Sequence, residues 1–178
     1  MDIGLRLLVE NGLFFAIATG FLVLSGWAWR NVTPFQLPKP LPGWFKLWFG
    51  SVIVLGSIPP LAVLIWSVWH GYRTVWMVLT AYFVMLILQV VSESLTLRRF
   101  QSVVWVMVPY LYVPYRLWQL YEGFLLVRSP ASPTLHWIQI ILIGEIVVWA
   151  INYLLDLAQL PRLFQWTGTQ ATERSHSG

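Results

Sequence analysis

Five runs of apolar residues, each close to the length that crosses a lipid bilayer, constrain the fold of this chain more than any other feature. A helix needs about 20 mostly apolar residues to span the hydrocarbon layer. The runs cover residues 12–29, 46–69, 74–91, 102–127 and 135–157. We therefore expect an all-α, polytopic transmembrane bundle of five spans over residues 1–161. Residues 162–178 would form a mobile cytoplasmic tail.

The composition agrees with this prediction and excludes several kinds of chemistry. Only 10% of the residues are charged, whereas soluble domains typically carry about 25%. The basic residues lie mostly at the ends of the apolar runs, which argues for membrane lipids and against nucleic acid as partners. The chain has no cysteine, so disulfides, thiolate nucleophiles and cysteine-based metal sites are excluded.

Arginine and lysine are divided unequally between the two predicted sides of the bundle. One side would hold Arg30, Lys39, Lys46, Arg98, Arg99, Arg162 and Arg174. The other side would hold only Arg6, Arg73 and Arg128. The positive-inside rule places the first group in the cytoplasm, so the N-terminus would lie outside and the C-terminus inside. Most of the twelve tryptophans lie near predicted span ends, as expected at a membrane interface. The membrane would be the cell's inner membrane or an internal one.

Two ionisable residues fall deep inside the predicted spans. Arg116 and Glu145 each lie roughly 15–17 Å below the outer surface, at a rise of 1.5 Å per residue. An unpaired charge at that depth costs several kcal/mol or more. We therefore predict that Arg116 and Glu145 pair near the midplane. Such a pair would be a clamp between two helices or a site for a substrate or a proton.

The fourth run has two prolines and several polar aromatic residues that could form the wall of a pocket. The predicted pocket residues are Pro109, Tyr110, Tyr112, Pro114, Tyr115, Gln119 and Glu122. Prolines interrupt the backbone hydrogen bonds of a helix, and the freed carbonyls must find partners or line a cavity. The same pattern also occurs as a simple packing device.

A second polar group is predicted near the cytoplasmic ends of the third and fifth runs. It consists of Gln89, Glu93, Asn152 and Asp156. These residues could surround the mouth of a cavity, or they could be solvated helix ends. Glu93 could also pair with Arg98 or Arg99.

No motif in the sequence indicates a reaction. Only His70 and His136 share a predicted face, near the outer interface, so no metal site is predicted, and there is no glycine-rich phosphate loop. We expect no catalytic residue and no cofactor. A lipid, a sterol-like molecule or a pigment would be a suitable ligand for an aromatic intramembrane pocket.

Residues 42–130 resemble the EXPERA family, which includes sigma-type receptors and emopamil-binding proteins. Pro42-Gly43-Trp44-Phe45-Lys46 is similar to that family's Pro-x-Trp-Phe-Lys element, and Pro59-Pro60 follows in mid-span. The segment from Pro109 to Pro114 is similar to Pro-Tyr-Leu-x-x-Pro, and Arg128-Ser129-Pro130 closes the region. The resemblance implies a bundle with a membrane-embedded cavity for sterols or similar ligands.

The chain lacks the acidic residues in its early spans on which that family's catalysis and amine binding depend. The runs 12–29 and 46–69 contain no aspartate or glutamate, and Val52 stands about where an acid would fall. The family's catalytic and amine-binding roles would then be absent, and the fifth run is additional. Three hypotheses follow: a non-catalytic binder or carrier of a hydrophobic small molecule or lipid, an accessory or assembly subunit of a larger membrane complex, and a small ion- or proton-coupled transporter.

Overall fold

The computed structural model describes residues 2–30, 43–100, 104–127 and 133–164, and within these ranges every element is an α-helix. The helices are α1 (Ile3–Ala28), α2 (Gly43–Leu55), α3 (Ile58–Trp69), α4 (Arg73–Phe100), α5 (Val104–Val127) and α6 (Pro133–Phe164). The prediction of an all-helical bundle is confirmed. Most of the predicted tail and of the linker before α2 lies outside the described residues.

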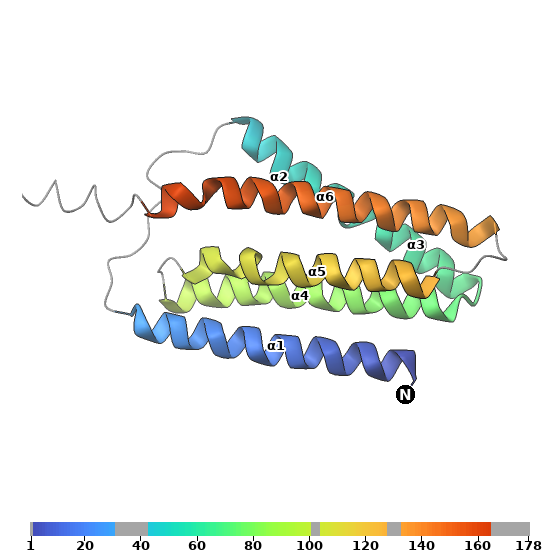
Figure 1. Ribbon diagram of the computed structural model, residues 1–178, viewed down its shortest axis with the longest axis horizontal. Helices are drawn as coiled ribbons and strands as arrows, with labels where there is room; N and C mark the ends of the chain where they lie inside the picture. Colours follow the sequence, from blue (N-terminus) through green and yellow to red (C-terminus); the bar gives the residue numbers. More distant parts are fainter. Residues whose placement is uncertain (1, 31–42, 101–103, 128–132, 165–178) are drawn as a thin grey trace, which may run out of the picture.

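The helices lie side by side along the long axis of the molecule, and successive passes run in opposite directions (Figure 1). The short helices α2 and α3 together make one pass. Helix α4 contacts α1, α3 and α5, while α5 contacts α1, α4 and α6. Helices α4 and α5 are therefore the inner members of the bundle.

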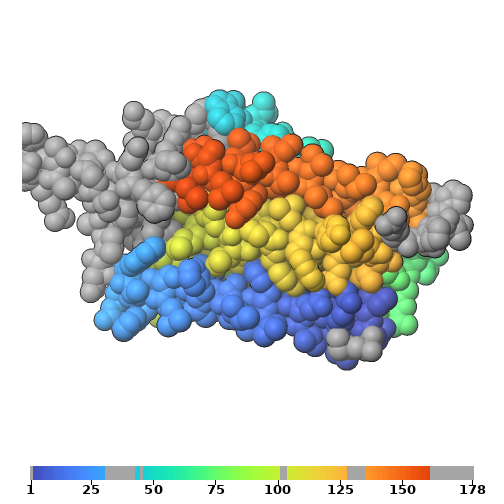
Figure 2. Space-filling model, viewed as in Figure 1, coloured from blue at the N-terminus to red at the C-terminus, as the bar shows by residue number. Residues whose placement is uncertain are grey.

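Four helical segments are long and apolar enough to cross a membrane. They are Ile3–Ala28, Lys46–Trp69, Arg73–Phe100 and Leu135–Leu160. Helix α5 is long enough, at about 36 Å, but it is less apolar because it carries Arg116, Gln119 and Glu122. A helix surrounded on several sides by other helices can hold such residues away from lipid. Figure 2 shows α5 as a strip of surface between α1 and α6.

Three helices extend beyond the predicted spans: α1, α4 and α6, of which α6 continues past residue 157 to Phe164. Helix α1 begins at Ile3 rather than at residue 12, and its Arg6 pairs with Glu10 and with Glu122 of α5. Helix α4 continues past residue 91 to Phe100. Arg98 and Arg99 lie in its last turn, where cations interact favourably with the helix dipole.

The pass made by α2 and α3 is broken where the sequence has Pro59 and Pro60. In an unbroken helix the carbonyl of Gly56 would accept a hydrogen bond from the backbone of residue 60, but proline has no N–H. The hydroxyl of Tyr82 on α4 donates to this carbonyl instead, at 2.6 Å. A carbonyl freed by proline has therefore found a partner on a neighbouring helix, as a buried polar group requires.

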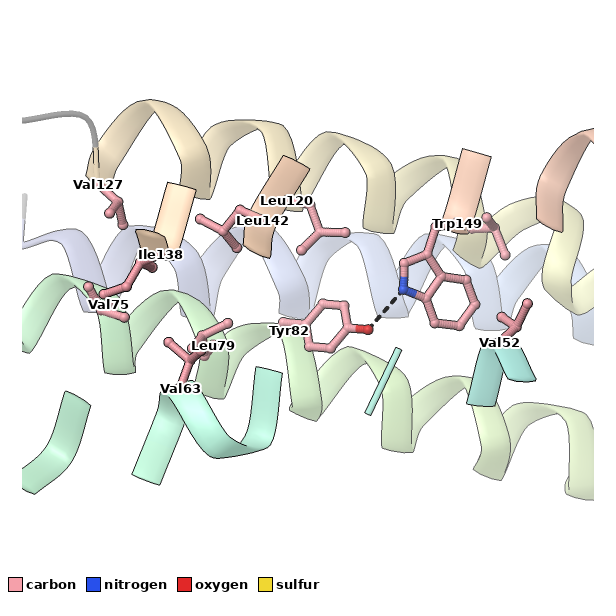
Figure 3. Packing of buried hydrophobic residues seen from close by; sticks show 11 residues of the cluster. Val52, Val63, Val75, Leu79, Tyr82, Leu120, Val127, Ile138, Leu142 and Trp149 are labelled. Carbon is pink, nitrogen blue, oxygen red and sulfur yellow. Dashed lines mark hydrogen bonds between the residues drawn. The ribbon is translucent and has the colours of Figure 1, made fainter. Parts of the chain in front are cut away.

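The largest apolar cluster connects α2 and α3 to α4, α5 and α6. Figure 3 shows it running from Val75, Val127 and Ile138 at one end to Val52 and Trp149 at the other. Smaller clusters join α1 to α4 and α5. The arrangement places Tyr82 and Trp149 in the interior, next to the polar residues described below.

Close packing of α4 on α5 predicts opposite effects for two glycine substitutions. A Cβ atom at Gly123 would overlap Cγ1 of Val78, whereas nothing lies within 4 Å of the equivalent atom at Gly144 on α6. We expect Gly123→Ala to lower the free energy of unfolding by about 1–3 kcal/mol, because overpacking forces the helices apart. Gly144→Ala should be neutral or stabilising by up to about 1 kcal/mol, since alanine favours helix. Detergent-denaturation curves of both variants test this, and equal effects would contradict the packing.

Candidate functional site

Arg116 is buried near the middle of α5, with only 1% of its surface exposed. Its Nη2 atom donates a hydrogen bond of 2.6 Å to Oε1 of Gln89 on α4. Its guanidinium lies over the ring of Trp149 on α6, 4.1 Å from the ring centre, and 5.7 Å from that of Tyr82. A cation over an aromatic face is attracted by the ring quadrupole, more strongly when water is excluded.

Glu145 lies close to this arginine but does not form the predicted direct ion pair. Glu145 is also buried, with 4% of its surface exposed, and the two charges interact electrostatically. Among the described residues, however, no salt bridge joins them. Gln89 accepts from Nη2 of Arg116, and Trp149, one turn beyond Glu145, covers a face of the guanidinium group. We call Tyr82, Gln89, Arg116, Glu145 and Trp149 the Arg116 cluster.

The Arg116 cluster extends to the break between α2 and α3. Nε1 of Trp149 donates to the hydroxyl of Tyr82 at 2.9 Å (Figure 3), and this hydroxyl in turn donates to the carbonyl of Gly56. A Cβ at Gly56 would come within 2.7 Å of the Trp149 ring, so glycine is needed for this approach. The cluster therefore joins four helical passes through hydrogen bonds and ring contacts.

Three buried atoms of the cluster have unused hydrogen-bonding capacity. Nε and Nη1 of Arg116 and Oε2 of Glu145 have no hydrogen-bond partner among the described residues. Leaving a buried polar atom unpaired costs about 1–3 kcal/mol, and more for a charged group. The site thus presents both donors and an acceptor in the interior of the bundle.

The second predicted polar group is brought together at one end of the bundle. Nε2 of Gln89 donates to Glu93 at 2.8 Å, and Nδ2 of Asn152 donates to Asp156 at 3.2 Å. The carboxyl groups of Glu93 and Asp156 interact electrostatically across α4 and α6. The alternative partners suggested for Glu93, Arg98 and Arg99, form no salt bridge with it in the described structure.

The predicted pocket residues of α5 lie on two faces of the helix: Tyr110 faces α6, whereas Tyr112, Tyr115, Gln119 and Glu122 all contact α1. Tyr110 points to α6, where its hydroxyl donates to the carbonyl of Asp156 at 2.6 Å. Tyr112 shares a hydrogen bond with Ser92 of α4, at 2.9 Å. Tyr115 donates to Asn11 of α1, at 2.8 Å. The three hydroxyl groups thus bond to three neighbouring helices, although the rings of Tyr112 and Tyr115 both pack against Phe14 of α1.

The two polar members, Gln119 and Glu122, both have their partners on α1. Nε2 of Gln119 donates to Asn11 at 3.2 Å, and Glu122 pairs with Arg6. Both prolines lie inside α5, and the helix continues through Pro109 and Pro114. The ring of Phe14 on α1 stacks on Tyr115 with ring centres 3.9 Å apart, so an aromatic side chain of the protein occupies this side.

Asn11 and Tyr82 are members of these networks that the sequence does not single out. Asn11 is buried and donates to the carbonyl of Ala81, while its own oxygen accepts from Tyr115 and Gln119. It precedes the predicted first span, where a polar residue is expected to face solvent. Trp149 differs, because its mid-span position already separates it from the tryptophans near span ends and favours another role.

The described residues contain no group of three histidine, cysteine, aspartate or glutamate side chains that could hold a metal ion. Comparison of the chain with protein-family models finds no match. No curated protein and no solved structure matches it either. The candidate site is therefore interpreted from its own geometry, and the resemblance to the EXPERA family stays a prediction.

Proposed function

We propose that this chain is a non-catalytic integral membrane protein that binds or carries a lipid or another hydrophobic small molecule, with the ligand's polar group held by Arg116 and Glu145. The observation that carries the proposal is the unused hydrogen-bonding capacity of Arg116 Nε, Arg116 Nη1 and Glu145 Oε2. A buried charge is rarely kept inside a membrane helix without a role. A ligand group that accepts from Arg116 and donates to Glu145 accounts for these atoms.

The local charge balance favours a neutral polar group on this ligand. The positive charge of Arg116 interacts with both Glu93 and Glu145, so the arginine is not a free cation that would attract an anion. A cationic ligand would be repelled by the buried guanidinium of Arg116. A group with both an acceptor and a donor, such as the carbonyl and N–H of an amide, suits the atoms that have no partner.

The proposal places this site within five membrane spans, with the N-terminus outside and the C-terminus in the cytoplasm. Helix α5 would cross the membrane together with the four apolar segments, and its neighbours α1, α4 and α6 would separate it from lipid. Arg98 and Arg99 lie at the end of α4, whereas Arg73, at the other end, is paired with Asp2. The cell's inner membrane or an internal membrane would supply the ligand laterally.

Native mass spectrometry of gently extracted protein tests the proposal. We expect the wild-type chain to retain a neutral amphiphile, and Glu145→Gln to lose most of it, because the substitution replaces one carboxylate oxygen by an NH2 group, which cannot accept from the ligand's donor. Glu122→Gln is the matched control, since it makes the same chemical change on α5 at a residue that pairs with Arg6. This variant should retain the ligand.

Equal retention by both variants, or no retained small molecule in the wild type, would contradict this assignment of the site. A second protein retained in place of a small molecule would instead favour the accessory-subunit hypothesis. The measurement therefore separates the two leading functions in one experiment.

A further inference from the structure

One end of the bundle has a group of arginines that form no salt bridge with any described residue. Arg30 follows α1, and Arg98 and Arg99 end α4. All three are exposed, and none forms a salt bridge within the described residues. The connecting segments 31–42 and 101–103 contain no aspartate or glutamate. These two segments therefore supply no carboxylate that could pair with the arginines.

The two helix ends that carry these arginines are in direct contact. A Cβ at Gly26 would lie 2.6 Å from the ring of Phe100. Arg98 and Arg99 immediately precede Phe100, and Arg30 lies one turn beyond Gly26. The backbone positions of the three arginines therefore lie close to the same contact between α1 and α4.

The surroundings of these arginines match the level of lipid headgroups. The guanidinium of Arg30 lies over the ring of Trp27, 4.9 Å from its centre, and exposed indoles prefer the membrane interface. Just below this level the surface is apolar, with Leu24, Leu95 and Leu97 all exposed. Cations next to an apolar surface fit a phosphate that carries acyl chains better than a free phosphate ion.

The opposite end of the bundle provides an internal comparison. There Arg6 pairs with Glu10 and Glu122, and Arg73 pairs with Asp2. The same residue type is thus neutralised by the chain at one end and left for an external anion at the other. We propose that Arg30, Arg98 and Arg99 form a binding site for the headgroup of an anionic phospholipid at the contact between α1 and α4.

This site lies at the end of the bundle and is independent of the ligand proposed for Arg116 and Glu145. Purified protein in a neutral detergent is titrated with phosphatidylglycerol or with phosphatidylcholine, and the bound lipid is measured by native mass spectrometry. We expect the wild type to bind the anionic lipid with roughly tenfold higher affinity, given the attraction contributed by each basic residue near such a headgroup. The preference should fall as the salt concentration rises.

Two double variants of equal net charge separate a site from general attraction. Arg98→Gln with Arg99→Gln should remove most of the preference for phosphatidylglycerol. Lys46→Gln with Arg73→Gln removes one positive charge from α2 and one from the opposite end of α4, and it should leave the preference nearly intact. Circular dichroism and the unfolding midpoint confirm that both variants are folded. Equal losses in the two variants, or no lipid preference in the wild type, would overturn the proposal.

Discussion

Replacing Arg116 by methionine is expected to lower the free energy of unfolding by about 3–5 kcal/mol, because removal of one partner leaves a buried charge uncompensated. Glu145 would lose the positive charge that interacts with it in the interior, and Gln89 would lose the donor to its side-chain oxygen. Methionine has a similar length, so the change tests charge more than volume. Reversible denaturation of the purified protein in mixed micelles measures the loss.

Two further variants give this prediction its controls. Arg6→Met removes an arginine whose side chain is 37% exposed, and exposed ion pairs typically contribute about 0–1 kcal/mol. Adding Glu145→Gln to Arg116→Met removes the uncompensated charge, so the double variant should be less destabilised than the sum of the single effects. Strict additivity, or a loss for Arg116→Met no larger than for Arg6→Met, would show that Arg116 and Glu145 are not coupled.

Trp149→Ala is expected to destabilise the bundle by about 3–5 kcal/mol, the usual cost of truncating a large buried aromatic side chain. Trp149 joins three partners: its N–H donates to Tyr82, its ring faces Arg116, and its edge packs on Gly56. Trp149→Phe keeps an aromatic face but loses the donor, and it should cost less than the alanine variant. Thermal unfolding followed by tryptophan fluorescence or circular dichroism measures both.

Trp118 supplies the comparison for this prediction. It lies on α5 but is 47% exposed, on the side of the helix that would face lipid. Trp118→Ala should therefore change the free energy of unfolding much less than Trp149→Ala. Similar losses for the two tryptophans would mean that the contacts of Trp149 do not stabilise the interior.

The burial of Arg116 and Glu145 follows from elementary electrostatics, but their partners do not. Ionisable groups in a membrane helix avoid lipid, and both residues are indeed buried. The sequence spacing placed them at similar depth and so suggested a direct pair. Which atom meets the guanidinium depends on side-chain directions and on competing groups. In the structure Gln89 accepts from Nη2 of Arg116, and Trp149 covers a face of its guanidinium group.

The prolines show the same division between what a sequence dictates and what packing decides. Pro60 removes the donor for the carbonyl of Gly56, so the need for another partner is evident from the sequence. That the partner is Tyr82 depends on how α4 lies against α2 and α3. Similarly, the apolar runs predicted where the helices lie. Charged residues such as Arg6 and Arg99 look like span ends in the sequence, so α1 and α4 are longer than the predicted spans.

The pocket predicted on α5 illustrates a further limit. Tyr110, Tyr112 and Tyr115 are close in sequence, but a helix turns by about 100° per residue. Tyr110 consequently faces α6, whereas Tyr112 and Tyr115, three residues apart, both pack against Phe14 of α1. Assigning residues to faces of α5 required knowledge of its neighbours.

The number of membrane crossings is the central claim of this account, because α5 is the one full-length pass of the described bundle whose composition does not itself indicate a span. An odd number of crossings puts the two ends of the chain on opposite sides, and four crossings put them on the same side. The absence of native cysteine allows a clean measurement. Asp2→Cys and Ser177→Cys are made separately and treated in intact cells with a membrane-impermeant thiol reagent. We expect labelling of Cys at position 2 without permeabilisation and of Cys at position 177 only after it. Labelling of both positions under the same condition would contradict the five-span bundle.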